Sequence, residues 1–369
     1  MGLGQSVEDL YFQQKVKLGH GGFGTVWRAI DRKTNHFVAV KEIDKLKAYW
    51  QGAKRSEIQM EISILQACDH TNITHLYNYF EDSSSISIVM EYCDGGDLDD
   101  KLKERGWKVP EEQAARWMHQ ICSAIRHLHE RDICHRDIKP GNFMLSASIL
   151  KLSDFGFARF LKRGVLCSEN IGTPAFMAPE QQLLKSGSSP GYGHPVDVWA
   201  AGCTLHMLIS GGRHPFVSKG KLDLPSLLDG HLDFGLMFGD LMSSETSARS
   251  LCRRMVCPVV KSRLSIEETL MDPWLQIHGQ QVDPLPEDMV FQGNATQKYQ
   301  QLQQQLLLAE KQLKEAEERE LSLKSRLQRQ DDSVVLISVP ITLPECMNRC
   351  TSCTSLARSS ERLERVKYR

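Results

Sequence analysis

The chain has 369 residues and a formal net charge of −1 at pH 7; 41% of its residues are hydrophobic and 25% are charged. These proportions are those of a globular protein, and the small net charge excludes a global basic field that would recruit nucleic acid. Eleven cysteines without the spacing of a disulfide framework indicate a reduced, intracellular protein. No apolar run reaches the ~20 residues that span a bilayer, and we see no apolar secretory segment, so we expect a cytoplasmic location.

Composition divides the chain into four segments. Residues 11–277, where apolar stretches alternate with Gly, Pro and Asp, are predicted to form the folded domain. Residues 278–296 are predicted to be a polar linker. Residues 297–330 are rich in Gln, Glu, Lys and Leu and lack Pro and Gly, which favours one long helix. Residues 331–369 are predicted to be a disordered tail.

The first part of the domain is typical of β-structure. Short runs rich in β-branched or aromatic residues predict strands at 15–18, 25–30, 37–43 and 87–90, with a helix at 56–67. Beyond Pro110 the pattern becomes helical, because apolar residues recur at three- and four-residue spacing and give one buried face. These residues are Ala114, Met118, Ile121, Cys122, Ile125 and Leu128. The sequence therefore predicts an α+β fold, with a β-rich part followed by an α-rich part.

A glycine-rich segment lies between the first two predicted strands. Residues 19–26 read Gly-His-Gly-Gly-Phe-Gly-Thr-Val. Glycine lets backbone N–H groups approach phosphate oxygens closely, but dinucleotide-binding folds use the same glycine spacing before a helix. Here the following residues favour a strand, so a loop that covers ATP between two strands is the better interpretation.

Lys41 lies in the third predicted strand, directly after Val-Ala-Val. A lone lysine at such a place is usually a surface charge, but after a glycine loop it is positioned to bind the α- and β-phosphates of ATP. That role requires a carboxylate to hold the ammonium group. Glu61 in the following helix is the preferred partner because it continues into the buried face, and Glu57, one turn earlier, is the alternative.

The strongest signal combines residues 135–142, His-Arg-Asp-Ile-Lys-Pro-Gly-Asn, with Asp-Phe-Gly at 154–156. Phosphoryl transfer requires a carboxylate to orient the attacking hydroxyl, oxygen ligands for Mg²⁺ and a cation to offset the charge of the transferring group. Asp137 suits the first role, Asn142 and Asp154 the second, and Lys139 the third. Asp and Asn are common turn residues, but their joint occurrence downstream of the glycine loop and Lys41 indicates catalysis.

These residues resemble a eukaryotic protein kinase of the serine/threonine type over residues 11–275. Residues 172–180, Gly-Thr-Pro-Ala-Phe-Met-Ala-Pro-Glu, resemble the substrate-side loop of serine/threonine kinases, and residues 197–202 resemble the central helix of the large lobe. The resemblance implies a bilobal fold with ATP and Mg²⁺ between the lobes and protein substrates with Ser or Thr. It also implies a buried ion pair between Glu180 and Arg263.

By the same resemblance, Met90 is the gatekeeper, Glu91 and Cys93 offer backbone groups to adenine, and Asp97 lies near the ribose. Gly141 stands where kinases that prefer basic sequences commonly carry glutamate, so such a preference stays open. The complete set of residues expected to bind ATP is Leu18, Gly19, His20, Gly21, Gly22, Phe23, Gly24, Val26, Ala39, Lys41, Glu61, Met90, Glu91, Cys93 and Asp97.

Glu169 occupies the position where related kinases often carry a phosphothreonine, four residues before Thr173. We expect its carboxylate to replace the phosphate in part, because a carboxylate has less charge and fewer acceptor oxygens. A solvated loop acid beside a phosphorylatable Ser168 is the alternative.

Residues 297–330 place apolar side chains on a heptad frame that predicts a coiled coil. Favourable i,i+4 pairs within the segment, such as Glu310 with Lys314, support a single helix as well. The segment is therefore predicted to self-associate weakly, to bind a helical partner, or to remain one solvated or docked helix.

Two features at the ends of the sequence concern modification and metal binding. Residues 1–6, Met-Gly-Leu-Gly-Gln-Ser, fit the acceptor pattern for myristoylation of Gly2, which would allow reversible membrane contact; the pattern is short, and an unmodified terminus is the alternative. Cys346, Cys350 and Cys353 are three thiols without a nearby fourth ligand, so exposed thiols in a tail are preferred over a zinc site.

The sequence thus predicts an ATP-dependent serine/threonine protein kinase. The alternative is a pseudokinase that acts as a scaffold through its helical tail, which would be expected to lack at least one of Lys41, Asp137 and Asp154. All three are present.

Overall fold

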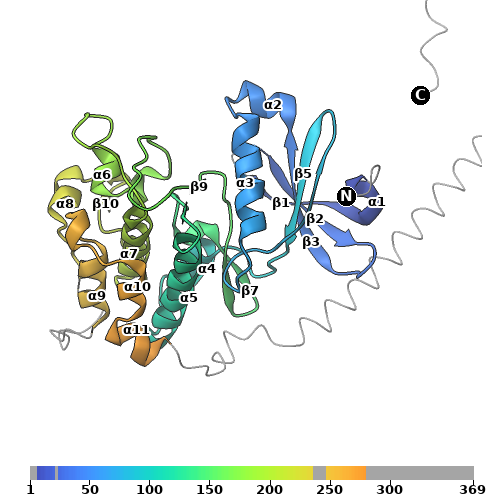
Figure 1. The fold of residues 1–369 in the computed structure, drawn as a ribbon. Helices are drawn as coiled ribbons and strands as arrows, with labels where there is room; N and C mark the ends of the chain where they lie inside the picture. The colour runs from blue at the N-terminus through green and yellow to red at the C-terminus, as the bar shows by residue number, and fades with distance from the viewer. Residues whose placement is uncertain (1–5, 21–23, 236–246, 280–369) are drawn as a thin grey trace, which may run out of the picture. The chain divides into compact units, whose positions relative to one another are not determined.

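The computed structural model describes residues 6–20, 24–235 and 247–279, and all of these belong to one compact unit of the chain. The strand-rich part begins with a single turn of helix, α1 (Val7–Leu10). An antiparallel sheet of five strands follows, in the order β1-β2-β3-β5-β4 (Figure 1). Its strands are β1 (Tyr11–His20), β2 (Thr25–Asp31), β3 (Phe37–Asp44), β4 (Leu76–Glu81) and β5 (Ser85–Glu91).

Two helices lie between β3 and β4 in the chain. The short α2 (Lys45–Trp50) is capped by Asp44, whose carboxylate accepts from the N–H of Lys47. The longer α3 (Arg55–Ala67) buries Ile58, Ile62 and Leu65 against the main hydrophobic core. The α3 helix therefore presents a fixed face to the sheet, and Glu61 lies on that face.

The predicted elements of this part are present, with bounds that differ by up to four residues at an end. The predicted strands at 15–18 and 87–90 are the inner parts of β1 and β5, and the predicted helix at 56–67 is α3. The sequence prediction missed β4 and α2. The β4 strand lies at the edge of the sheet, and none of its residues is fully buried, so it lacks the alternation that marks a strand.

The helix-rich part packs around α5 (Glu111–His129) and α7 (Pro195–Ile209). Twelve residues of α5 are buried, including the apolar positions that predicted the helix. In α7 every residue after Pro195 is buried, as expected for a helix surrounded by others. The other α-helices within the described residues of this part are α4 (Leu98–Glu104), α6 (Pro179–Gln182), α8 (Leu224–Asp229), α9 (Ala248–Met255), α10 (Ile266–Leu270) and α11 (Pro273–His278).

Short antiparallel strand pairs carry the loops that matter for function. The loop 135–142 runs from β6 (Ile133–Cys134) through the 3-10 turn η1 (Pro140–Asn142) to β7 (Phe143–Ser146), and residues 153–158 connect β8 (Ile149–Leu152) to β9 (Arg159–Phe160). Since β6 pairs with β9 and β7 pairs with β8, both loops emerge side by side. The described residues also form the 3-10 turns η2 (Pro174–Phe176) and η3 (Val260–Ser262) and the hairpin of β10 (Val217–Ser218) with β11 (Lys221–Leu222).

The architecture fits the bilobal protein kinase fold that the sequence predicts. Among the helices of the described ranges, none combines the length and apolar character needed to cross a bilayer. The predicted helix at 297–330 and the cysteines at 346, 350 and 353 lie outside the described residues.

Candidate active site

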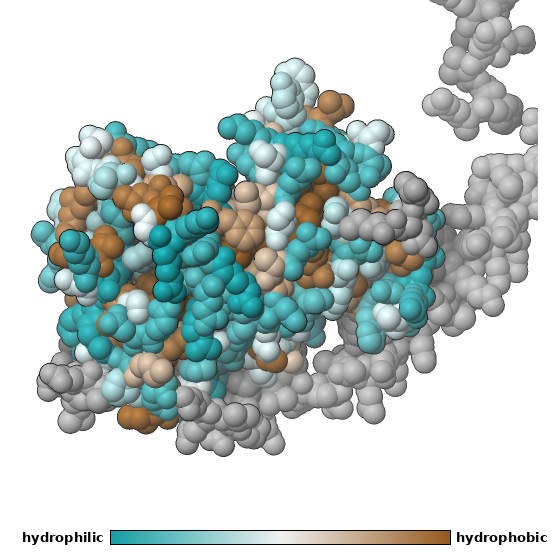
Figure 2. Space-filling model, in the orientation of Figure 1, coloured by the Kyte–Doolittle hydropathy of each residue, from teal (hydrophilic) through white to brown (hydrophobic). Residues whose placement is uncertain are grey.

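A cavity of about 510 Å³ lies between the sheet and the helix-rich part. The face shown in Figure 2 is mostly hydrophilic, and apolar side chains gather where the two parts meet. Of the residues expected to bind ATP, ten line this cavity: Leu18, Gly19, Val26, Ala39, Lys41, Glu61, Met90, Glu91, Cys93 and Asp97. The two predicted metal ligands, Asn142 and Asp154, line it as well.

The other predicted residues of the glycine-rich segment are placed differently. Gly24 lies against β3, where an added Cβ would meet the carbonyl of Glu42, so a residue without a side chain is required there. Residues 21–23 and the side chain of His20 lie outside the described part of the chain. Several residues that line the cavity were not predicted: Leu65, Thr74, Tyr92, Asp94, Gly96, Gly141, Met144, Ser153 and Phe155.

Lys41 is buried at the back of the cavity and pairs with α3. Its Nζ lies 2.6 Å from Oε1 of Glu61 and 3.8 Å from Oδ1 of Asp154. Glu57, the alternative partner, instead accepts a hydrogen bond from the N–H of Lys54 at the start of α3. Burial lowers the pKa of Lys41, but Glu61 and Asp154 outweigh this effect and hold the pKa above its ordinary value. The ammonium group is therefore charged at neutral pH and fixed from two sides.

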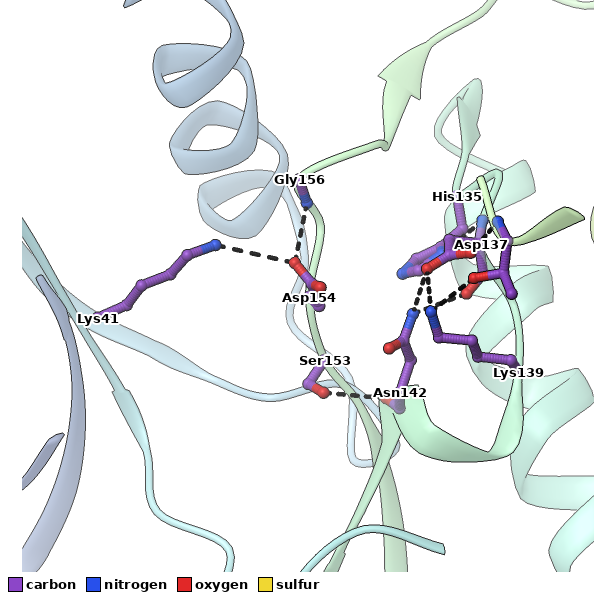
Figure 3. A network of polar contacts seen from close by, with 9 residues as sticks. Lys41, His135, Asp137, Lys139, Asn142, Ser153, Asp154 and Gly156 are labelled. Carbon is purple, nitrogen blue, oxygen red and sulfur yellow. Dashed lines mark hydrogen bonds and ion pairs between the residues drawn. The ribbon is translucent and has the colours of Figure 1, made fainter. Parts of the chain in front are cut away.

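Asp137 lies at the centre of a network of polar contacts (Figure 3). Its Oδ2 accepts from Nζ of Lys139 at 2.7 Å and from Nδ2 of Asn142 at 3.0 Å, and its Oδ1 accepts from the N–H of Thr173 at 2.8 Å. Burial raises the pKa of Asp137, but the hydrogen bonds from Lys139 and Thr173 outweigh it and leave the pKa below its ordinary value. The carboxylate is therefore ionised and held in one orientation.

Lys139 connects this network to residues 172–180. Its Nζ donates to Oγ1 of Thr173 at 2.7 Å as well as to Asp137. Gly172, which precedes Thr173, has a φ of +115°, and an added Cβ would lie 2.5 Å from the carbonyl oxygen of Arg136. Only glycine allows the two loops to approach this closely, so the segment that carries Thr173 packs directly on the loop that carries Asp137.

The residues predicted to bind Mg²⁺ offer oxygens toward the cavity. Asn142 is buried, and its Nδ2 donates to both the carbonyl and the carboxylate of Asp137, which turns its amide oxygen to the side of Asp154 (Figure 3). Asp154 has a φ of +56°, and its side chain is 43% exposed. An amide oxygen and a carboxylate are ligands that Mg²⁺ prefers, so this donor set fits the ion.

Asp197 in α7 holds the backbone of the loop 135–142. Its carboxylate accepts from the backbone N–H groups of His135 and Arg136, each at 2.9 Å, and interacts with Nε2 of His129 at 3.0 Å. Burial raises the pKa of Asp197, but His129 outweighs it and lowers the pKa to about 2. The sequence analysis placed Asp197 in a central helix and gave it no role at the site. Its contacts with His129, His135 and Arg136 join residues more than 60 positions apart in the chain, and no local pattern predicts them.

Glu169 bridges two arginines near the site. Its Oε2 lies 2.7 Å from Nη1 of Arg136, and its Oε1 lies 2.7 Å from a terminal nitrogen of Arg159 in β9. The Arg136 side chain is only 2% exposed, and its Nε donates to the carbonyl of Phe157. The hydrogen bond from Arg136 and the charge of both arginines lower the pKa of Glu169.

The implied ion pair between Glu180 and Arg263 is present in the helix-rich part. Nη1 and Nη2 of Arg263 donate to the two carboxylate oxygens of Glu180, at 2.7 and 2.9 Å, and the guanidinium lies 5.1 Å from the ring centroid of Trp199. A bidentate pair of this kind fixes geometry as well as charge. It anchors the end of residues 172–180 to the helical core.

Comparison with known proteins agrees with this geometry. The family model described as "Protein kinase domain" matches residues 12–275. The chain is 32% identical over 266 residues to "Probable serine/threonine-protein kinase fhkC" of Dictyostelium discoideum, which covers 71% of this chain and 44% of that protein. It is 35% identical over 270 residues to mouse "Serine/threonine-protein kinase DCLK3", covering 71% and 32% respectively.

A plant relative gives the same result. The chain is 33% identical over 282 residues to "Calcium-dependent protein kinase 9" of Arabidopsis thaliana, covering 74% of this chain and 50% of the relative. The chain thus spans half or less of the length of these relatives. Because the family model matches most of the chain and includes every residue of the site described above, the chain belongs to the protein kinase family.

Proposed function

We propose that the protein is an ATP-dependent serine/threonine protein kinase that transfers the γ-phosphoryl group of ATP to Ser or Thr hydroxyls of proteins. One observation carries the proposal: Lys139 and Thr173 hold the carboxylate of Asp137 beside a cavity that Lys41, Asn142 and Asp154 line. The relatives named serine/threonine-protein kinases support the choice of acceptor.

Each residue has a distinct task in this reaction. Asp137 orients the attacking hydroxyl and accepts its proton at a carboxylate oxygen, and Lys139 stabilises the negative charge of the transferring group. Lys41, held by Glu61, binds phosphate oxygens, while the backbone near Glu91 and Cys93 receives adenine. When bound, Mg²⁺ neutralises charge on the phosphates, and Asn142 and Asp154 are the residues proposed to hold it.

The proposal predicts Mg²⁺-dependent transfer from labelled ATP to a degenerate Ser/Thr peptide library. The library also reports sequence preference, including whether Asp97 selects basic residues in the absence of a glutamate at Gly141. ATP binding, measured by thermal shift, without any transfer would favour the pseudokinase alternative. Retention of Lys41, Asp137 and Asp154 argues against that alternative.

We also propose that Glu169 replaces an activating phosphate in part. Its two arginine contacts place a negative charge where it neutralises Arg136, the residue next to Asp137. Its lowered pKa means that the ion pair is complete at any pH above the ordinary glutamate pKa of about 4.3. The interaction is lost only as the pH falls through the lowered value, so it persists at neutral pH.

Glu169→Gln is expected to lower kcat on the order of tenfold, the scale of a charge-assisted hydrogen bond. Phosphatase treatment of the wild type is expected to leave activity unchanged, as is Ser168→Ala. The matched control is Glu130→Gln, which removes an exposed acid that pairs with Arg126 and Arg131. Loss of activity after phosphatase treatment, or full activity of Glu169→Gln, would contradict the proposal.

The heptad pattern of residues 297–330 leads us to propose that this segment is a helix that associates with a second copy or a helical partner. We expect sedimentation equilibrium of the full chain to show a concentration-dependent dimer, and deletion of residues 297–330 to abolish it. A full chain that remains monomeric at high concentration would exclude self-association and leave three alternatives: a helix that binds a partner protein, one docked on the kinase domain, or one that is solvated.

For Gly2 we propose N-myristoylation, on the basis of the acceptor pattern at residues 1–6. One acyl chain binds membranes weakly and reversibly, so a mainly cytoplasmic protein with transient membrane contact is expected. A mass spectrum of the N-terminal peptide that shows a free or acetylated Gly2 would refute this.

A further inference from the structure

Tyr192 contacts both residues of the ion pair between Arg136 and Glu169. Glu169 belongs to the activation segment, which we define as residues 157–173. It lies in the loop between α6 and α7 (Figure 1) and is 1% exposed. Its hydroxyl donates to the backbone carbonyl of Glu169 at 2.8 Å and accepts from Nη1 of Arg136 at 3.3 Å. One phenol therefore connects the backbone of Glu169 to the guanidinium that the Glu169 side chain binds.

The backbone of Tyr192 is fixed to the activation segment as well. Its N–H donates to the carbonyl of Cys167 at 2.9 Å, and its carbonyl accepts from the N–H of Cys167 at 2.8 Å. The preceding Gly191 has a φ of +134°, and an added Cβ would lie 2.8 Å from Cβ of Leu166. Glycine at this position thus permits the close approach, and the hydroxyl of Tyr192 is held at a fixed distance from Arg136.

The charge state of the hydroxyl suits this arrangement. Burial raises the pKa of Tyr192 above its ordinary value, although Arg136 opposes the effect. The phenol therefore keeps its proton at neutral pH and can donate to Glu169. A buried tyrosine hydroxyl usually has one hydrogen-bond partner, whereas the hydroxyl of Tyr192 has two, because it both donates and accepts.

We propose that Tyr192 is a positioning residue for the phosphotransfer reaction, which acts by holding Glu169 and Arg136 in their paired arrangement. Glu169, Arg136 and Tyr192 form one unit, which we call the anchor. The inference rests on the proposed kinase function and extends it to a residue outside the loops that contact the substrates.

The anchor restrains Asp137 from two directions. Arg136 precedes Asp137 in the chain and has a φ of +68°. The contacts of its guanidinium group and the hydrogen bond from its N–H to Asp197 therefore fix the backbone position of Asp137. On the other side, Glu169 lies four residues before Thr173, whose N–H binds the Asp137 carboxylate. A loosened anchor therefore displaces Asp137 relative to the acceptor hydroxyl, and a small misplacement of a reacting group lowers the rate strongly.

The test is Tyr192→Phe in the full chain, which keeps the buried ring and removes the hydroxyl. We expect kcat to fall on the order of five- to tenfold, the scale of one buried hydrogen bond, with the KM for ATP unchanged because the hydroxyl is remote from the nucleotide cavity. The matched control is Tyr11→Phe, since Tyr11 is also a buried tyrosine and lies in β1 of the sheet. Tyr11→Phe is expected to keep the wild-type kcat.

A coupling measurement separates positioning from general stability. In the Glu169→Gln background, Tyr192→Phe is expected to cause less than a twofold further loss of kcat, because the Glu169–Arg136 ion pair that the hydroxyl positions is already lost. Additive losses in the double variant would overturn the proposal, as would a drop in kcat that follows the melting temperature equally in Tyr192→Phe and Tyr11→Phe. Absence of phosphotransfer by the wild type would instead refute the kinase function itself.

Discussion

Asp137→Asn is expected to lower kcat on the order of 10²–10⁴-fold, the range that a positioned general base contributes. The substitution removes the charge and the proton-accepting oxygen while keeping the size of the side chain. The remaining carboxamide oxygen still accepts from Lys139 or from the N–H of Thr173, so the loop is expected to keep its conformation. The measurement is single-turnover transfer of labelled phosphate to the best peptide from the library.

The matched control is Asp100→Asn, which makes the same chemical change at an exposed position of α4, where the side chain is 70% exposed. We expect its kcat to equal that of the wild type. A thermal melt of Asp137→Asn checks that the fold persists, and ATP binding measured by thermal shift checks that the cavity is intact. Activity above about a tenth of wild type in Asp137→Asn would contradict the role of Asp137 as base.

The sequence predicted the residues of the site that follow one another along the chain. Asp137, Lys139 and Asn142 lie within one loop, and the spacing of their side chains is set by the local backbone, so their types and order predicted the chemistry. Predicting that Glu61 is the partner of Lys41 also required the periodicity of the following helix. Because α3 is amphipathic and Glu61 lies on its buried face, the periodicity favoured Glu61 over Glu57, and the structure places it 2.6 Å from Lys41.

Contacts between distant segments could not be predicted in this way. Thr173 donates to an acid 36 residues earlier, and Tyr192 binds an arginine 56 residues away. Arg159 was not recognised as a partner of Glu169, although the two are only ten residues apart, because their approach depends on how the activation segment folds back. Such contacts follow from the packing of loops on the helical core, which no local pattern encodes.

The short elements were missed for a different reason. The α2 helix has six residues, fewer than two turns, so it shows no periodicity. Three of its apolar residues, Leu46, Tyr49 and Trp50, are also 71–82% exposed, and a helix whose apolar residues face solvent gives no amphipathic signal. The periodicity of apolar residues predicts elements that contribute to the core. It does not predict elements whose apolar residues are exposed.

Lys41→Met is the second substitution with a large expected effect. Met retains the length of the stem, so the cavity wall is preserved while the ammonium group is lost. Since that group fixes phosphate oxygens, kcat/KM for ATP is expected to fall on the order of 10²-fold, the loss that accompanies misplacement of a reacting group. Initial rates at several ATP concentrations measure this change.

The same substitution has a cost in stability that can be measured separately. Glu61 is 3% exposed. Replacing Lys41 by Met leaves its buried carboxylate without a neutralising cation. Breaking a buried ion pair in this way costs about 3–5 kcal/mol, so the melting temperature of Lys41→Met is expected to fall. In Lys41→Met/Glu61→Gln the unpaired charge is gone, so we expect stability to recover while activity stays low.

This pair of outcomes distinguishes a catalytic ion pair from a structural one. If Lys41 and Glu61 only stabilised the fold, then the double variant would regain activity together with stability. Glu57→Gln is the control on the same helix, because it removes a charge one turn from Glu61 and leaves the ion pair untouched, while its amide oxygen still accepts from the N–H of Lys54. Equal losses of activity in Glu57→Gln and Glu61→Gln would mean that α3 as a whole, rather than the Lys41–Glu61 contact, determines how ATP is held.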